Sequence, residues 1–193
     1  EIETTLENPA IGSMDMHLLR KCPCPLWLIR ADAPKQFRRI LAAVDPVPGE
    51  DENSINIQIL ELATSLAHQE GCRLLIVRIY QDTGETFPAE KMDSGELHKY
   101  LEHIQMVRLK NDREIIGKFA GEQGNFDVLY LHGNPSQIIT EVTRREEVDL
   151  IVLGTVAQGG VAGMLMGRTA ENVLRQTSCS VLGVKHKDFI CPV

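Results

Sequence analysis

A glycine-rich segment from Gly154 to Thr169 is the part of this sequence best suited to hold an anion. It reads GTVAQGGVAGMLMGRT, follows an apolar run and precedes an amphipathic one. Glycines let backbone N–H groups approach a phosphate, and the N-terminus of a following helix adds roughly half a positive charge. The spacing matches neither the GxxxxGK[ST] phosphate loop nor the GxGxxG dinucleotide fingerprint. The segment therefore predicts an anion-binding loop of another type.

A single acid, Asp45, ends the apolar run Phe37 to Asp45. A run of this kind predicts a buried strand, and in an open parallel sheet ligands bind beyond the carboxyl ends of the strands. Asp45 and Gly154 both follow such strands, so both are candidate site residues. Three further acids at positions 50 to 52 would repel phosphate unless a divalent cation intervenes.

Cys22 and Cys24 form a CxC pair. The five cysteines of the chain lack the paired CxxC spacing of a zinc site. Free cysteine is commonly a small buried hydrophobe, which favours a packing role, and a redox-active dithiol or a metal site is the alternative. No serine or cysteine nucleophile is visibly coupled to a base, so the sequence predicts neither a catalytic residue nor a metal site.

Apolar, β-branched runs alternate with helical patterns along the chain. The strands are expected at Phe37 to Asp45, Cys72 to Tyr80, Phe126 to His132, Asp149 to Gly154 and Ser180 to Lys185. The helices are expected from Ser54 to about Glu70, from about Gly95 to Ala120, from Ser136 to Glu146 and from about Gly167 to Thr177. This alternation predicts an α/β fold with right-handed crossovers and a parallel sheet covered by helices on both faces.

Two segments of the chain resemble each other, Gly12 to Arg30 and Gly167 to Lys185. The aligned identities are Gly12 with Gly167, Leu19 with Leu174, Arg20 with Arg175 and Cys24 with Cys179. The offset is 155 residues, the difference between positions 12 and 167, which is the length of one domain. We therefore expect residues 1–33 to hold the last helix and strand of a first domain, and residues 34–193 to form a complete second domain.

Composition narrows the classes of partner. The net charge of −7 provides no broad basic field, which disfavours non-specific binding to nucleic acid or to an anionic membrane. No apolar run approaches the roughly 20 residues of a transmembrane helix, and no signal-like segment opens the chain. These features favour a cytoplasmic protein whose partner is a small molecule or another protein.

The strand and helix order, Asp45 and the loop from Gly154 to Thr169 together resemble the universal stress protein family. The sequence LRKCPCP, read as the end of a preceding domain, is similar to its tandem, two-domain members. The resemblance covers residues 37–185 as one domain and 12–30 as the end of another. It implies a Rossmann-like, five-stranded parallel sheet in the order 3-2-1-4-5, of the adenine nucleotide alpha hydrolase type.

The resemblance also implies a set of site residues. In nucleotide-binding members an acid after the first strand meets adenosine, a residue near the end of the second strand lines the adenine pocket, and the glycine-rich loop holds phosphates. Carried over by position, the candidate nucleotide-binding residues are Asp45, Ile79, Gly154, Ala157, Gly167, Arg168 and Thr169. The implied ligand is ATP or AMP with a divalent cation.

Two positions depart from the family's pattern. Ala157 replaces the second glycine of the loop, and its methyl group would crowd a phosphate or disfavour a positive φ. Arg168 replaces a serine or threonine, which removes a hydroxyl but brings a bidentate anion donor. These departures favour a non-catalytic stress-response module that acts through domain pairing and ligand sensing. An ATP- or AMP-binding switch with at most slow ATP hydrolysis is the alternative.

The repeated strands predict how the chain associates. The last strand of such a sheet is an edge, and an apolar edge invites pairing. In this family the corresponding edges are commonly used for dimerisation. We therefore expect Leu26 to Arg30 to lie antiparallel beside Ser180 to Lys185 within the chain, with Trp27 at the junction. A homodimer through the same kind of edge is left open.

Overall fold

A computed structural model describes residues 11–46, 54–81, 94–119, 126–156, 166–186 and 189. Its strands are β1 (Leu26–Leu28), β2 (Arg39–Val44), β3 (Arg73–Tyr80), β4 (Phe126–His132), β5 (Leu150–Gly154) and β6 (Ser180–Val184). Its helices are α1 (Ser13–Lys21), α2 (Ser54–Glu70), α3 (Ser94–Phe119), α4 (Pro135–Arg145) and α5 (Arg168–Gln176). Each element expected after residue 36 is present, with bounds within two residues of the prediction.

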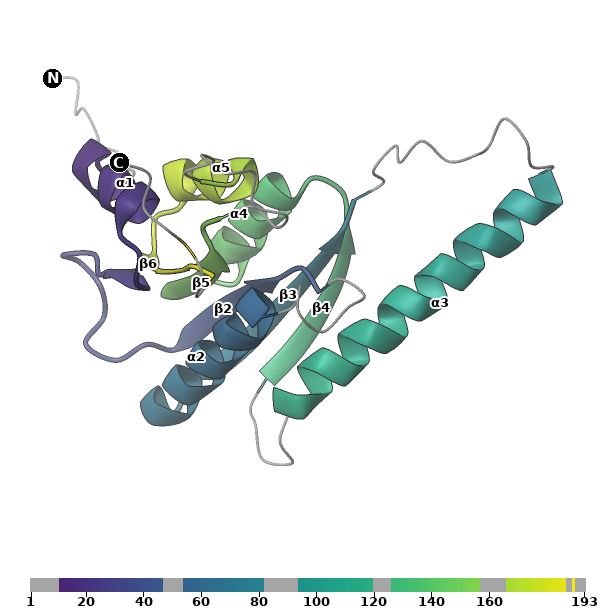
Figure 1. The fold of residues 1–193 in the computed structure, drawn as a ribbon. Helices are drawn as coiled ribbons and strands as arrows, with labels where there is room; N and C mark the ends of the chain where they lie inside the picture. The colour runs from purple at the N-terminus through teal and green to yellow at the C-terminus, as the bar shows by residue number, and fades with distance from the viewer. Residues whose placement is uncertain are drawn as a thin grey trace, which may run out of the picture.

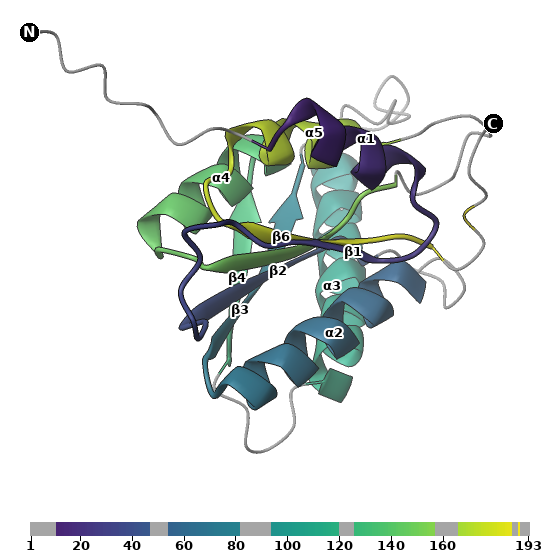
Figure 2. The same cartoon turned by 90° about the vertical axis from the view of Figure 1, so that its left-hand side faces the viewer.

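The described strands form one sheet in the order β1-β6-β5-β2-β3-β4. Strands β2 to β6 run parallel, and their order is the predicted 3-2-1-4-5. The prediction of five strands is wrong by one, because β1 joins the edge antiparallel to β6 (Figure 2). Leu26 lies opposite Gly183 and Leu28 opposite Val181. The sheet is therefore six-stranded and mixed, since the segment before residue 33 adds its strand to the same sheet.

Helices cover both faces of this sheet (Figures 1 and 2). Helices α2 and α3 lie on one face, and α1, α4 and α5 lie on the other. Successive strand residues point to opposite faces, so each strand must be apolar on both. The strands contribute Ile40, Leu74, Ile76, Leu150 and Val152 to the α2 and α3 side, and Leu41, Leu75, Val77, Ile151 and Val181 to the other.

Local signals fix where the helices begin and end. The side chain of Asn134 accepts hydrogen bonds from the backbone N–H groups of Ser136 (3.1 Å) and Gln137 (3.3 Å), and Pro135 occupies the first turn of α4. These contacts satisfy N–H groups that have no partner within a helix. Gly71 follows α2 with φ of 65°, a conformation that favours glycine and ends the helix. The sequence predicted both ends correctly.

The two copies of the repeat lie side by side. Helices α1 and α5 are neighbours above the paired strands β1 and β6 (Figure 2), and Arg20 Nη2 donates to Glu171 Oε1 at 2.7 Å. Leu19 and Leu174, which align in the repeat, are both fully buried. Trp27 lies opposite Leu182 in the pairing of β1 with β6. Its ring packs against Phe37, with centroids 6.0 Å apart, and 38% of the residue stays exposed.

Within the part of the chain that the structure describes, no helix is long and apolar enough to cross a membrane.

Gly183 of β6 lies directly beneath the side chain of Leu19 in α1. A Cβ atom there would lie 2.7 Å from Leu19 Cδ2 and 2.8 Å from Thr155 Cγ2. We expect Gly183→Ala to lower the free energy of unfolding by about 1–3 kcal/mol, because the added methyl group overpacks this contact. Urea denaturation followed by circular dichroism measures the change.

Gly117→Ala is the control for this prediction. A Cβ atom at Gly117 in α3 meets nothing within 4 Å, so the substitution should stabilise the helix by up to about 1 kcal/mol. Equal effects of the two alanine substitutions would contradict the close packing at Gly183.

Candidate ligand-binding crevice

A crevice of about 610 Å³ lies at the carboxyl ends of the central strands. Strands β2, β3 and β5 are parallel neighbours, so their ends meet at one edge of the sheet. The volume lies in the range of small-molecule pockets, about 300–1,000 Å³. The fold therefore places a cavity of ligand size where the sequence predicted a site.

Six of the seven predicted site residues line this crevice. They are Asp45 after β2, Ile79 in β3, Gly154 at the end of β5, and Gly167, Arg168 and Thr169 at the start of α5. The seventh, Ala157, lies outside the described residues. Residues more than 100 positions apart in the chain are thus brought to one cavity by the parallel sheet.

Gly154 has a packing role as well as a place in the crevice. A Cβ atom at this position would lie 2.9 Å from Ile55 Cδ1, in the first turn of α2. Real Cβ atoms do not approach this closely, so glycine lets α2 pack against the end of β5. The glycine that begins the predicted anion-binding loop is therefore explained by helix packing even without a ligand.

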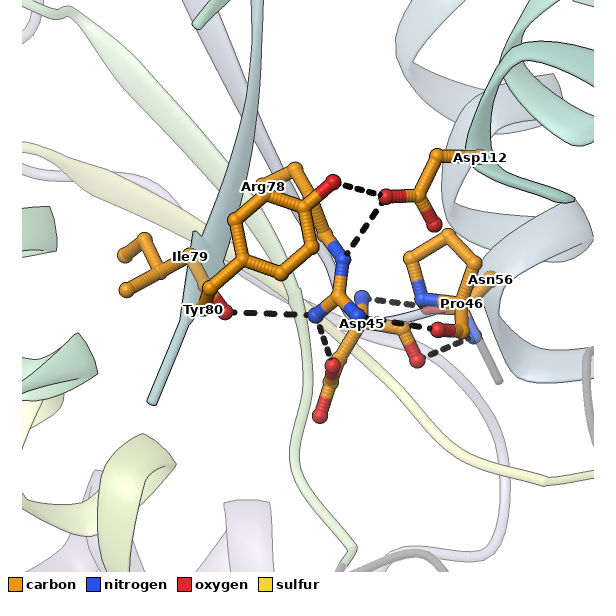
Figure 3. Close-up of polar contacts among 7 residues, drawn as sticks. All are labelled: Asp45, Pro46, Asn56, Arg78, Ile79, Tyr80 and Asp112. Atoms are coloured by element: carbon orange, nitrogen blue, oxygen red, sulfur yellow. Dashed lines mark hydrogen bonds and ion pairs between the residues drawn. The ribbon is translucent and has the colours of Figure 1, made fainter. Parts of the chain in front are cut away.

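A buried arginine that the sequence analysis did not select forms part of the wall. Arg78 of β3 is only 6% exposed and points to the α2 and α3 side of the sheet (Figure 3). Its Nη1 donates to Oδ1 of Asp45, and its Nη2 donates to the backbone oxygen of Pro46 at 3.1 Å. The guanidinium of Arg78 thus binds both the side chain and the backbone that follow β2.

The same guanidinium also contacts an acid on α3. Arg78 Nε lies 3.3 Å from Oδ2 of Asp112, which is fully buried and also accepts a hydrogen bond from the Tyr80 hydroxyl at 2.5 Å. Burial, reinforced by that hydrogen bond to Asp112, raises the pKa of Tyr80, so its hydroxyl stays protonated and donates. Oδ1 of Asp112 has no hydrogen-bond partner among the described residues. A buried charge needs a partner of opposite sign, and Arg78 is that partner.

Asn56 of α2 fixes the backbone of Asp45. Its Oδ1 accepts from the Asp45 N–H at 2.9 Å, and its Nδ2 donates to the Asp45 carbonyl at 3.0 Å (Figure 3). Asn56 is buried, so these bonds are shielded from water and hold the end of β2 against α2. Asp45 is therefore positioned by Asn56 through its backbone and by Arg78 through its carboxylate.

The sequence held a signal for Arg78 but not for its pairing with Asp112. Arg78 interrupts the apolar run LLIVRIY, and a cation within a strand covered on both faces must find an anion. Asp112 lies 34 residues further on, in a long helix with many charges. Only the packed orientation of α3 decides which of those charges faces inward.

The described residues offer no cluster of three or more His, Cys, Asp or Glu side chains that could hold a metal ion. The acids at positions 50 to 52, which raised the question of a divalent cation, lie outside the described residues.

The fold and the crevice define an α/β protein with a ligand-sized site at the carboxyl ends of a parallel sheet. The sequence pattern of the universal stress protein family matches residues 36–185, and this chain belongs to that family. It is similar to the universal stress protein E homolog of Haemophilus influenzae, with 33% identity over 186 residues that cover 95% of this chain and 59% of the relative. The chain thus spans about three fifths of that relative.

Other relatives match the chain at different lengths. Universal stress protein E of Escherichia coli is 26% identical over 196 residues, which cover 97% of this chain and 59% of the relative. A universal stress protein from Thermus aquaticus is 29% identical over 149 residues, which cover 77% of this chain and 99% of the relative. The predicted resemblance to the family, and to members longer than this chain, is confirmed.

Solved structures show the same fold. A Pseudomonas aeruginosa protein of unknown function superposes with a TM-score of 0.75 at 24% identity, covering 96% of this chain and 60% of that protein. UspA from Lactobacillus plantarum gives 0.58 at 18% identity, covering 78% and 99%. A universal stress protein in complex with cAMP gives 0.51 at 16% identity, covering 80% and 100%.

The network around Arg78 predicts a large effect of one substitution. We expect Arg78→Met to lower the free energy of unfolding by about 3–5 kcal/mol, because it leaves the Asp112 carboxylate buried without a cation. The double variant Arg78→Met with Asp112→Asn should recover part of that loss. Urea denaturation at neutral pH measures both.

Arg73→Met is the matched control on the same strand. Arg73 Nε lies 2.6 Å from Asp127 Oδ2, but the two side chains are 43% and 47% exposed. An ion pair so open to water should contribute less than about 1 kcal/mol. If Arg78→Met were no more destabilising than Arg73→Met, the buried network would not have the role described above.

Proposed function

We propose that this chain is a non-catalytic stress-response module that binds and senses a small ligand in the crevice without transforming it. The observation that most supports this proposal is that Asp45 already has partners within the chain. The acid expected to serve the ligand is held by Arg78 and Asn56. These contacts orient the Asp45 carboxylate and its backbone in the wall of the crevice, where a fixed polar group can hold a ligand in one orientation.

The charges of the crevice favour an anionic ligand. Asp45 and Asp112 both contact Arg78, and the other charged groups among the described lining residues are Arg108 and Arg168. Arg168 is exposed in the first turn of α5, where a planar guanidinium binds carboxylate or phosphate groups in two-point contacts. Other lining residues, such as Ile79 and Leu153, are apolar and suit a hydrophobic portion of the ligand.

An adenine-nucleotide switch, with at most slow ATP hydrolysis, is the second candidate. It is favoured by the fold, which this chain shares with a universal stress protein in complex with cAMP, and by the place of Gly167 and Thr169 beside the crevice. In such a switch a ribose hydroxyl would share the Asp45 carboxylate with Arg78, whose Nη1 donates to Oδ1, while 69% of the Asp45 side chain is exposed.

The proposal includes a domain arrangement. We infer that α1 and β1 are the last helix and strand of a first domain and that residues 34–193 form the second. The repeat supports this division, since α1 and β1 lie beside their sequence equivalents α5 and β6. Edge pairing of this kind would join two domains within one chain. The alternative arrangement is a homodimer in which two chains pair through equivalent edges.

Calorimetric titration with AMP and ATP, each with and without Mg²⁺ or Mn²⁺, separates the two candidates. If the chain senses a ligand other than a nucleotide, we expect weak or no binding of AMP and ATP at millimolar concentration. Asp45→Asn should then leave nucleotide binding unchanged. For a nucleotide switch, Asp45→Asn should weaken binding by about tenfold or more, because a hydrogen bond to a charged group is worth about 1.5–3 kcal/mol. Asp127→Asn, on an exposed acid near the opposite end of the sheet, is the control.

A thermal-shift panel tests the sensing role directly. The panel contains nucleotides, sugar phosphates and organic carboxylates at millimolar concentration, applied to the chain and to Arg168→Gln. We expect at least one anion to raise the melting temperature of the chain, with a smaller rise in Arg168→Gln. A panel without any shift would overturn ligand sensing. Robust turnover of a substrate that is lost on changing Asp45 or Arg168 would overturn the non-catalytic assignment.

A further inference from the structure

Two thiols lie close together in the turn between α1 and β1. The Sγ atoms of Cys22 and Cys24 are 3.1 Å apart, with Cys24 exposed and Cys22 partly exposed. A disulfide needs about 2.05 Å between its sulfurs, so the two atoms must approach by roughly 1 Å to bond. Pro23 and Pro25 restrict the backbone φ angles of the turn, which limits how far the thiols can separate.

The second copy of the repeat has the same geometry with different chemistry. Cys22 aligns with Thr177 and Cys24 with Cys179, and Thr177 Oγ1 lies 3.1 Å from Cys179 Sγ. That pair is buried, so it packs and cannot react easily, and burial raises the pKa of Cys179. In the first copy the hydroxyl is replaced by a thiol and the pair reaches the surface. The packing role expected for these cysteines therefore holds for Cys179 but not for Cys24.

The surroundings make the two thiols unequal. The hydrogen bond with Cys24 lowers the pKa of Cys22, and the same bond raises the pKa of Cys24. The buried ammonium of Lys185 donates to the Arg20 carbonyl at 2.9 Å, and its charge also lowers the pKa of Cys22. Since the thiolate is the attacking species, Cys22 is placed to react first and Cys24 to react second.

We propose that Cys22 and Cys24 form a redox-active dithiol, oxidised to an intrachain disulfide by a low-molecular-weight disulfide. The Cys22 thiolate attacks one sulfur of the oxidant, forms a mixed disulfide and expels one thiolate. Cys24, as its thiolate, then attacks Cys22 Sγ, forms the Cys22–Cys24 bond and expels the second thiolate. The two cysteine protons pass to the expelled thiolates, so the chain loses two electrons and the oxidant becomes two thiols. This site is independent of the crevice and of its ligand.

The test exposes the full chain to glutathione disulfide, quenches it with acid, alkylates the remaining thiols and maps the peptides by mass spectrometry. We expect the peptide that contains both Cys22 and Cys24 to lose two hydrogens and to escape alkylation. Cys72 and Cys179, which are buried, should remain reduced. Reduction with dithiothreitol should restore both alkylation sites.

Two variants sharpen the test, with circular dichroism to check that each is folded. Cys24→Ser should stop after the first step and accumulate glutathione on Cys22. Cys22→Thr recreates the Thr–Cys pair of the second copy and should form no disulfide. Full alkylation of Cys22 and Cys24 after exposure to oxidant, glutathione held independently on both, or stoichiometric metal on the purified chain would each overturn the proposal.

Discussion

The guanidinium of Arg78 is the contact on which the crevice depends. A cation in the interior of a sheet is stable only with anions around it, and here they come from Asp45 at the end of β2 and Asp112 on α3. One side chain thus connects the neighbouring strands β2 and β3 with a helix that covers them. The wall of the crevice and the buried charges of the core share one network, because Arg78 contacts both Asp45 and Asp112.

The chain belongs to the universal stress protein family, and its structure gives the strand order and the crevice at the carboxyl ends of the strands. Family membership does not by itself give the ligand, because proteins that share a fold can bind different molecules. Asp45 has its carboxylate on Arg78 and its backbone on Asn56. A Cβ atom at Gly154 would also crowd the side chain of Ile55, so Gly154 has a packing contact as well as a place in the crevice. Asp45 and Gly154 thus both have contacts within the chain that do not depend on a ligand. This is why we favour sensing of an anion over a nucleotide-driven activity.

The repeat shows how equivalent positions acquire different chemistry. Helix α1 and strand β1 lie beside α5 and β6, so the two copies share one face and one edge of the sheet. The pair Thr177 and Cys179 is covered, whereas Cys22 and Cys24 meet solvent at the same separation. The reactivity of a thiol depends on its exposure and its pKa. The exposed pair can therefore react with an oxidant in solution, whereas the buried pair cannot do so easily.

The sequence by itself determined the elements and their order. Continuous apolar runs required strands covered on both faces, and Asn134, Pro135 and Gly71 fixed helix ends through local backbone chemistry. It also placed Asp45 and Gly154 at strand ends, hence at one edge of a parallel sheet. Only the tertiary structure decided that Asp112 faces Arg78, and that Cys24 is exposed while Cys179 is buried. The physical reason is the distance along the chain over which each signal acts. Periodicity and helix capping act over a few residues, whereas residues 34 or 155 positions apart come into contact only when whole helices and strands pack together.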